Sequence, residues 1–128
     1  MSATITVDVP RELWLSSNRP VRIHAHKARI VRALHVLGHA AAVRAHLTPQ
    51  QGPLVACWTV QYPRGVRWDK GDAANSAPTT KALLDALVPT WLADDGPRDI
   101  AEERFRRGPN LTVPGIHRVT LELREEEA

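Results

Sequence analysis

Three aspartates and one lysine have the types and spacing that suit hydrolytic chemistry in this sequence. Asp72 precedes a short apolar-periodic stretch, Lys81 lies within it, and Asp94 and Asp95 follow it. Mg²⁺ takes hard oxygen ligands such as carboxylates, and the bound ion polarises a phosphoryl oxygen and helps generate a hydroxide nucleophile. A nearby lysine stabilises charge that develops on the phosphoryl oxygens. The pattern predicts a phosphodiester-hydrolysing metal site formed by two loops that flank a helix.

The same residues also have an ordinary structural interpretation. Asp72 follows a glycine, and the pair Asp94 and Asp95 precedes one, as is common in turns. Lys81 and Asp85 are spaced i, i+4 on the expected helix, where a surface ion pair contributes a few tenths of a kcal/mol, roughly. Spacing alone therefore leaves a metal site and a set of turns both open.

The elements that would position these residues follow from hydrophobic periodicity. Period-two alternation predicts strands, and apolar residues that recur every three or four positions predict helices. Ser76 is the expected cap of the second helix. The expected elements are strands at 4–9, 54–61, 99–106 and 116–123, and helices at 25–45 and 78–88.

This order predicts a single α/β domain, with a mixed β-sheet of about four strands and two main helices. We expect the domain to span residues 1–124 and an acidic, solvated tail to occupy residues 125–128. A length of 128 residues fits one domain with a real core. The strand at 54–61 is apolar on both faces, which predicts a central position in the sheet.

Charge and cysteine content narrow the class of partner and the compartment. The net charge is +3 although the tail is acidic, and a basic body favours a polyanionic partner such as nucleic acid. Cys57 is the one cysteine, so an intrachain disulfide is excluded and a reducing, cytoplasmic setting is expected. No apolar run approaches a membrane span and no signal-peptide pattern begins the chain, so we expect no membrane partner.

A longer pattern surrounds the aspartates and the lysine. It reads D-x-x-N, then P-T-x-K-x-x-x-D-x-L, then D-D, and it resembles the signature of RusA-type Holliday junction resolvases, closest to actinobacterial and phage versions. The segment 15–19, Leu-Ser-Ser-Asn-Arg, resembles the early asparagine-containing loop of that family. The matching positions are Asp72, Asn75, Pro78, Thr79, Lys81, Ala82, Asp85, Leu87, Asp94 and Asp95.

The resemblance implies a RusA-like fold and a homodimeric endonuclease that uses Mg²⁺, or Mn²⁺ as a substitute, to nick four-way DNA junctions symmetrically. The resemblance also implies that this endonuclease needs no small-molecule cofactor. By the same resemblance Asp72 and Asp95 are metal-binding and catalytic residues, Lys81 is the catalytic lysine, and Asp94 is a further metal ligand.

One position departs from the family pattern. Ala74 stands where the family has its second aspartate, and the loss of one of three carboxylates is expected to weaken Mg²⁺ binding. The resemblance therefore leaves two functions open: an endonuclease that Ala74 impairs, and a catalytically inactive junction-binding protein. Natural loss and deliberate substitution both account for Ala74. A basic α/β domain with no nucleic-acid role is a third interpretation.

The residues expected to contact DNA are basic or amide side chains in loops and at strand ends. Contacts of this kind to phosphates set affinity rather than sequence preference. Trp68, beside Arg67 in a basic loop, is the tryptophan expected to stack on an unpaired base. The expected DNA-binding residues are Asn18, Arg19, Arg64, Arg67, Lys70, Asn75, Arg104, Arg106 and Arg107.

Overall fold

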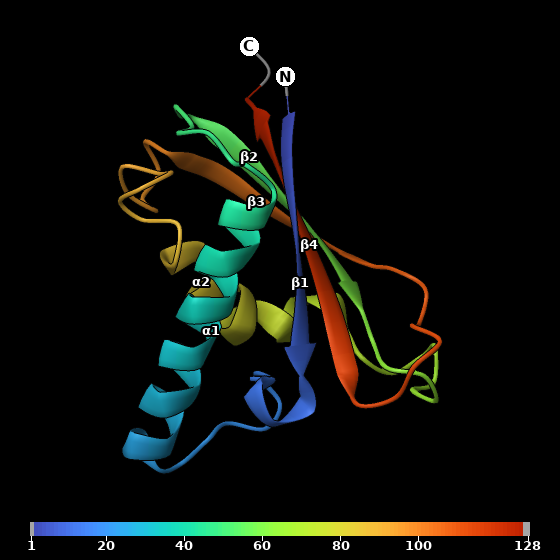
Figure 1. Ribbon diagram of the computed structural model, residues 1–128. Coiled ribbons are helices and arrows are strands. Elements are labelled where there is room, and N and C mark those ends of the chain that lie inside the picture. The colour runs from blue at the N-terminus through green and yellow to red at the C-terminus, as the bar shows by residue number, and fades with distance from the viewer. Residues whose placement is uncertain (1, 127–128) are drawn as a thin grey trace.

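A computed structural model describes residues 2–126, which form a four-stranded sheet with two helices (Figure 1). Two short 3-10 helices, η1 and η2, complete the regular structure. In chain order the elements are β1 (Ser2–Pro10), η1 (Arg11–Leu13), α1 (His24–Arg44), β2 (Leu54–Gln61), η2 (Ala73–Ser76), α2 (Ala77–Asp85), β3 (Ile100–Arg107) and β4 (Ile116–Glu125). The predicted class, one α/β domain with a mixed sheet and two main helices, is confirmed.

The strands lie in the order β1-β4-β2-β3. β4 pairs antiparallel with β1 and with β2, whereas β2 pairs parallel with β3. The connection from β2 to β3 contains η2 and α2, the kind of crossover that a parallel pair requires. β2 therefore occupies the central position that its two apolar faces predict. Of the expected acidic tail, Glu125 ends β4, and residues 127–128 lie outside the described part.

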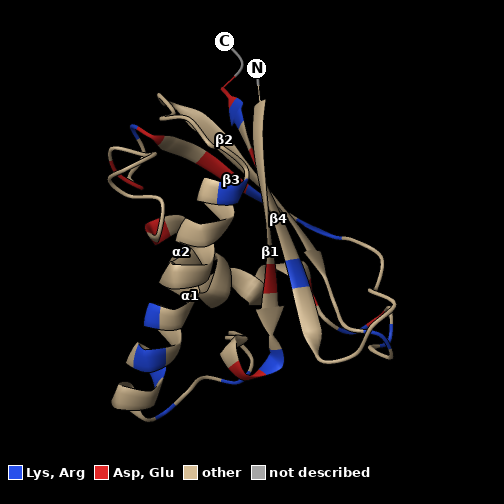
Figure 2. Cartoon of the chain, viewed as in Figure 1, with Lys and Arg blue, Asp and Glu red and all other residues tan. Residues whose placement is uncertain are grey.

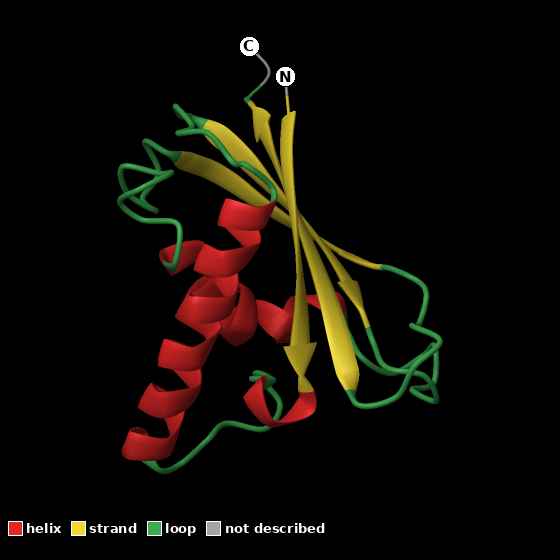
Figure 3. Cartoon of the chain, in the orientation of Figure 1, coloured by secondary structure: helices red, strands yellow, loops and turns green. Residues whose placement is uncertain are grey.

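The core lies between the sheet and the helices, which cover the same face of the sheet (Figure 3). Alternate residues of each central strand point into it, so Trp58 and Val60 of β2 meet Val119 and Leu121 of β4 across the antiparallel register. All four are buried, as period-two alternation predicts for the covered face. The opposite face of the sheet has no helix over it, and its side chains are polar or charged on most strands.

The first helix has the predicted apolar stripe. Ile30, Leu34 and Ala41 are buried, and Leu37 packs at the edge of the core. Gly38 brings α1 and α2 together, because a Cβ at this position would lie 2.9 Å from Cβ of Ala86. Within residues 2–126, no helix is both long and apolar enough to cross a membrane.

The second helix is shorter than the predicted span 78–88, since it ends at Asp85. Tighter turns follow, with the Leu87 amide donating to the Leu84 carbonyl, and a proline follows Val88, which disfavours helical backbone at that residue. Ser76 occupies the N-cap position without making the predicted capping bond. Its hydroxyl donates instead to the carbonyl oxygen of Ala73, at 2.6 Å.

Candidate active site and nucleic-acid interface

The early loop and the central motif are joined by buried hydrogen bonds. The Leu15 amide donates to Oγ1 of Thr79, and that hydroxyl donates in turn to the Leu15 carbonyl, both at 2.8 Å. The Ser17 amide donates to the carbonyl oxygen of Asn75 at 2.9 Å. A bridge between Ser16 and Arg19 closes the loop that carries Asn18. The loop at 15–19 is thus fixed against η2 and the start of α2, although about sixty residues separate them in sequence.

Asp72 begins this segment as the N-cap of η2. Its Oδ1 accepts a hydrogen bond from the Ala74 amide at 3.0 Å, and its carbonyl oxygen accepts one from the Tyr62 hydroxyl, also at 3.0 Å. Tyr62 directly follows β2, so the end of a central strand sets the position of the Asp72 backbone. The Asp72 side chain is exposed, and its second carboxylate oxygen accepts no hydrogen bond from any residue in the described range.

Lys81 connects α2 to the loop that follows it. Its Nζ donates to Oδ1 of Asp85 at 2.8 Å, the i, i+4 pair that the sequence suggests, and also to Oδ2 of Asp95. These hydrogen bonds raise the pKa of Lys81, with Asp85 the larger cause. Hydrogen bonding with Asp85, and then with Lys81, lowers the pKa of Asp95 to about 2, whereas burial raises the pKa of Asp85. Lys81 and Asp95 therefore stay charged across the neutral range.

Two further carboxylates lie beside this ion pair. Oδ1 of Asp94 accepts a hydrogen bond from the Asp95 amide at 2.8 Å, so Asp94 shapes the turn while its side chain stays exposed. Burial raises the pKa of the carboxyl group of Glu103 in β3, and the charges of Lys81 and Asp95 act on the same group. Sequence reasoning missed Glu103. Its neighbour Arg104 points to the other face of the sheet. The register of β3 against β2 is therefore needed to place Glu103 on the helix-covered face.

The donor set decides whether a divalent metal fits. Among residues 2–126 there is no group of three or more His, Cys, Asp or Glu side chains arranged to hold a metal ion. Asp72 and Asp95 remain as hard oxygen donors, and Mg²⁺ is commonly held by one or two carboxylates together with substrate phosphates. The chemistry of these two carboxylates fits that mode of binding. A carboxylate ligand from position 74 is excluded, because the alanine side chain has no donor atom.

The predicted DNA-binding arginines of β3 point to opposite faces of the sheet. Arg104 and Arg106 pair in register with Cys57 and Thr59 of β2, on the face without helices. Arg107 lies on the other side. The expected basic cluster is therefore divided between two surfaces, because successive side chains of a strand alternate.

The half-buried Arg107 side chain forms hydrogen bonds within the protein. Its guanidinium donates to the carbonyl oxygens of Lys70 and Gly108, at 3.1 and 2.8 Å, and to Oδ1 of Asn110 at 2.7 Å. The Asn110 amide group donates in turn to the carbonyl oxygen of Val66. Arg107 and Asn110 thus hold the loop at 63–71. Sequence reasoning assigned Arg107 to DNA and missed Asn110 and Tyr62, for which side-chain placement in space was needed.

The loop at 63–71 is basic and projects beyond the strand ends next to the loop at 108–115 (Figure 2). It carries Arg64, Arg67 and Lys70, all exposed, against a single carboxylate, Asp69. Asp69 forms an ion pair with Arg67 at 2.9 Å. Within the described residues, the side chains of Arg64 and Lys70 form no salt bridge, so their charges face solvent.

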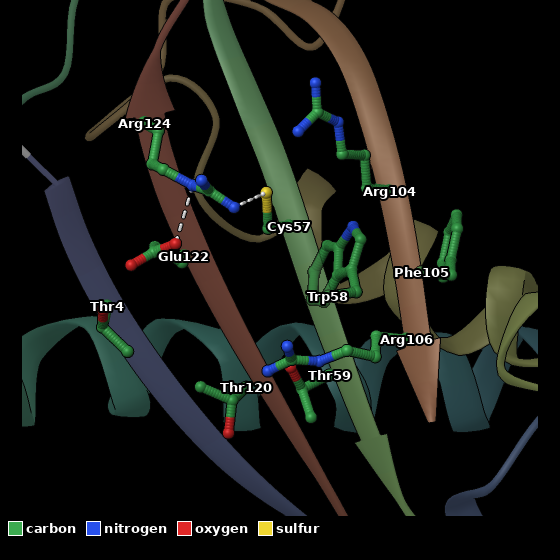
Figure 4. A pocket seen from close by; sticks show the side chains of 10 residues that line it. All are labelled: Thr4, Cys57, Trp58, Thr59, Arg104, Phe105, Arg106, Thr120, Glu122 and Arg124. Atoms are coloured by element: carbon green, nitrogen blue, oxygen red, sulfur yellow. Dashed lines mark hydrogen bonds and ion pairs between the residues drawn. The ribbon is translucent and has the colours of Figure 1, made fainter. Parts of the chain in front are cut away.

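The open face of the sheet holds a shallow pocket of about 580 Å³ (Figure 4). Arg106 extends over it toward Thr59 and Thr120, and within residues 2–126 its guanidinium has no acidic partner. Arg124, which sequence reasoning missed, is bound by Glu122 at 2.7 Å and by the sulfur of Cys57 at 2.8 Å. Arg104, the third arginine of the pocket, forms an ion pair with Glu102 at 2.9 Å, so Arg106 is the arginine here that is most available to an anion.

Neither protein-family models nor curated proteins give a match to this chain.

Proposed function

We propose that this chain is a RusA-type protein of DNA recombination, repair or phage DNA processing, a structure-specific endonuclease directed to four-way junctions. Its metal site lacks one carboxylate because of Ala74, which lowers its activity. The motif resemblance supplies the substrate class. The active form is a homodimer, since symmetrical nicks across a two-fold junction require two related sites.

The observation that carries the proposal is that hydrogen bonds and an ion pair join the separate segments of the motif. Thr79 joins the asparagine-containing loop to α2, Asp72 caps the turn that precedes the helix, and Lys81 joins the helix to Asp95. The arrangement supports a site that uses all three segments.

In this proposal Asp72 and Asp95 hold Mg²⁺, with Asp94 beside them, and the DNA phosphates supply further oxygens. The bound ion supplies Lewis acidity and an activated water. Lys81 keeps Asp95 ionised and places one positive charge at the site, where it stabilises charge on the phosphoryl oxygens. Asn75, whose amide donates to the Asp72 carbonyl oxygen, positions the DNA strand together with Asn18 and Arg19 of the loop that is bonded to it.

Phosphate contacts outside the site come from the two basic surfaces. Arg64 and Lys70 of the 63–71 loop are free of salt bridges within the described residues, as is Arg106 on the open sheet face. Arg67 and Arg104 contribute charge that nearby carboxylates partly neutralise. Such contacts make affinity depend on salt and carry no sequence information.

A second candidate function, junction binding without cleavage, is favoured by one specific observation. The Lys81 ammonium already neutralises Asp95, and position 74 offers no ligand, so a divalent ion competes with an internal cation at a weakened site. Junction recognition needs only the basic surfaces. This candidate predicts tight binding and no nicking at any Mg²⁺ concentration.

The test is a comparison of the native chain with Ala74→Asp and, as a matched control, Ala74→Asn. The exposed position 74 accepts either side chain without core disruption, and the asparagine lacks the charge. A labelled four-way junction and a linear duplex of the same sequence are incubated with Mg²⁺, and binding is measured in Ca²⁺.

We expect symmetrical nicking of the junction to rise at least about tenfold in Ala74→Asp and to stay unchanged in Ala74→Asn. Junction binding without nicking by every variant would favour the second candidate. Equal affinity for junction and duplex at moderate salt would contradict both, and would favour a basic domain with no role in junction processing.

A further inference from the structure

Trp68 is an exposed aromatic side chain that the catalytic proposal does not use. About two thirds of its surface is open to solvent, at 67% exposure. It lies in the 63–71 loop between Arg67 and Asp69, at one end of the sheet. Because large aromatic groups are normally buried or half-buried, an open indole on a basic loop points to a binding surface.

The Arg107 guanidinium packs against the indole ring of Trp68. The guanidinium carbon of Arg107 lies 4.8 Å from the centroid of the Trp68 ring and 4.7 Å from that of Tyr62. Tyr62 is buried next to β2, and it packs edge-on against Trp14 and His117. The Arg107 guanidinium thus connects the exposed Trp68 ring to a group of aromatic rings that begins in the protein interior.

The backbone around Trp68 is also fixed. Arg107 donates to the Lys70 carbonyl oxygen, Asn110 donates to the Val66 carbonyl oxygen, and the Arg64 amide donates to the Val113 carbonyl oxygen at 2.8 Å. These bonds tie the 63–71 loop to the end of β3 and to the 108–115 loop. A ring presented on a fixed loop loses little conformational freedom when a ligand stacks on it.

Charge around the ring selects the kind of ligand. Arg64 and Lys70 flank the loop with no salt bridge inside the described residues, while Asp69 is occupied by Arg67. A flat aromatic surface on a loop that also carries exposed positive charges suits a nucleobase whose neighbouring phosphates meet the cations. An acidic protein segment would use the charges and would leave the indole without a partner.

We propose that Trp68 is a stacking platform for an unpaired DNA base next to the bound junction. This inference rests on the proposed function for its DNA substrate, and it adds the element that recognises an unstacked base. Arg107 is a positioning residue here: it supports the indole and does not contact the DNA.

The experiment compares Trp68→Ala and Trp68→Phe with the native chain. The matched control is Val113→Ala, because Val113 is an exposed apolar residue at 46% on the adjoining loop. The probes are a fully paired duplex and the same duplex with one extrahelical 2-aminopurine. Affinity is measured by anisotropy in Ca²⁺, and stacking is measured by quenching of the 2-aminopurine fluorescence.

We expect the native chain to quench the extrahelical base. Trp68→Ala is expected to abolish quenching and to weaken binding of the bulged probe about tenfold, within the range measured for loss of base stacking. Binding of the paired duplex stays unchanged, Trp68→Phe retains most of the quenching, and Val113→Ala behaves as the native chain.

Equal weakening of both probes by Trp68→Ala, or no quenching by the native chain, would overturn the stacking platform. Preference for a four-way junction is measured in the same samples. If that preference persists while Trp68→Ala has no effect on the bulged probe, the platform fails and the junction proposal stands. If the native chain stacks the base yet prefers no junction, the junction proposal fails instead.

Discussion

Lys81 and Asp95 form an ion pair that crosses from a helix to the loop beyond it, 14 residues later in the sequence. The Lys81 side chain is 61% exposed and that of Asp95 is 26% exposed. Water screens such a pair, so its contribution to the free energy of unfolding is small. The ion pair instead fixes the positions of the Lys81 ammonium and the Asp95 carboxylate relative to each other.

Lys81→Ala is accordingly expected to lower the free energy of unfolding by less than about 1 kcal/mol. In the Ala74→Asp background it should abolish nicking while junction affinity in Ca²⁺ stays the same. Urea denaturation, anisotropy and gel-based cleavage measure the three quantities. Normal cleavage by the double variant would remove Lys81 from the catalytic proposal.

The adjacent residues Arg106 and Arg107 are expected to respond in opposite ways to substitution by glutamine. Arg106→Gln removes an unpaired surface charge, so stability should change by less than about 0.5 kcal/mol. Its plot of log affinity against log salt should become shallower by about one unit, as for one lost phosphate contact. Arg107→Gln breaks internal hydrogen bonds and should lower stability by about 1–3 kcal/mol.

Thermal denaturation and salt titrations with the junction distinguish the two arginines. A shallower salt dependence in Arg107→Gln with unchanged stability would show that Arg107 contacts DNA and does not act through the loop.

His117 predicts how stability depends on pH. Its ring stacks on Trp14, with centroids 3.8 Å apart, and its Nδ1 is buried without a hydrogen-bond partner in the described structure. Burial lowers the pKa of His117 to about 4, from 6.5. The unfolded chain therefore binds the extra proton between these values, so the free energy of unfolding falls as the pH drops from 6.5 to 4.

The loss is at most about 3.5 kcal/mol, since each pKa unit corresponds to ~1.4 kcal/mol. His117→Phe keeps a stacked ring and removes the titration, so its urea midpoint should fall less over this interval. Parallel profiles for the two proteins would show that His117 does not titrate as described.

Thr79→Val tests the link between the early loop and α2. Valine matches the shape of threonine but leaves the buried Leu15 amide and carbonyl without partners, at a cost of about 1–3 kcal/mol. Thr80→Val is the control. Thr80 is equally buried, yet its hydroxyl donates only to the Ala77 carbonyl within its own helix, at 3.2 Å. A smaller effect is expected there, and equal denaturation midpoints would contradict the assignment.

Sequence reasoning located the strands well because their alternation is a local property. It placed the bounds of β2 (Leu54–Gln61) correctly, and it predicted the Lys81–Asp85 pair from helical spacing. The parallel pairing of β2 with β3 depends on a crossover and has no local signal. The three arginines of β3, at 104, 106 and 107, were all assigned to DNA, although successive side chains of a strand point to opposite faces.

The candidate site was harder to anticipate in its details. Residue types and motif spacing selected Asp72, Lys81 and Asp95, but nothing local placed Glu103 beside them or bound Thr79 to Leu15. These contacts join residues that are distant in sequence, so they follow from the fold as a whole.

The outer strand β3 also bears on how copies of this chain meet. Its backbone has one free edge in the described sheet, since β2 pairs with the other side. Five of its eight residues are charged, and dense charge on an edge strand disfavours pairing with the edge of another molecule. Edge-to-edge pairing through β3 is therefore disfavoured, so a second copy has to associate through another surface, such as the β1 edge of the sheet, a face or a helix.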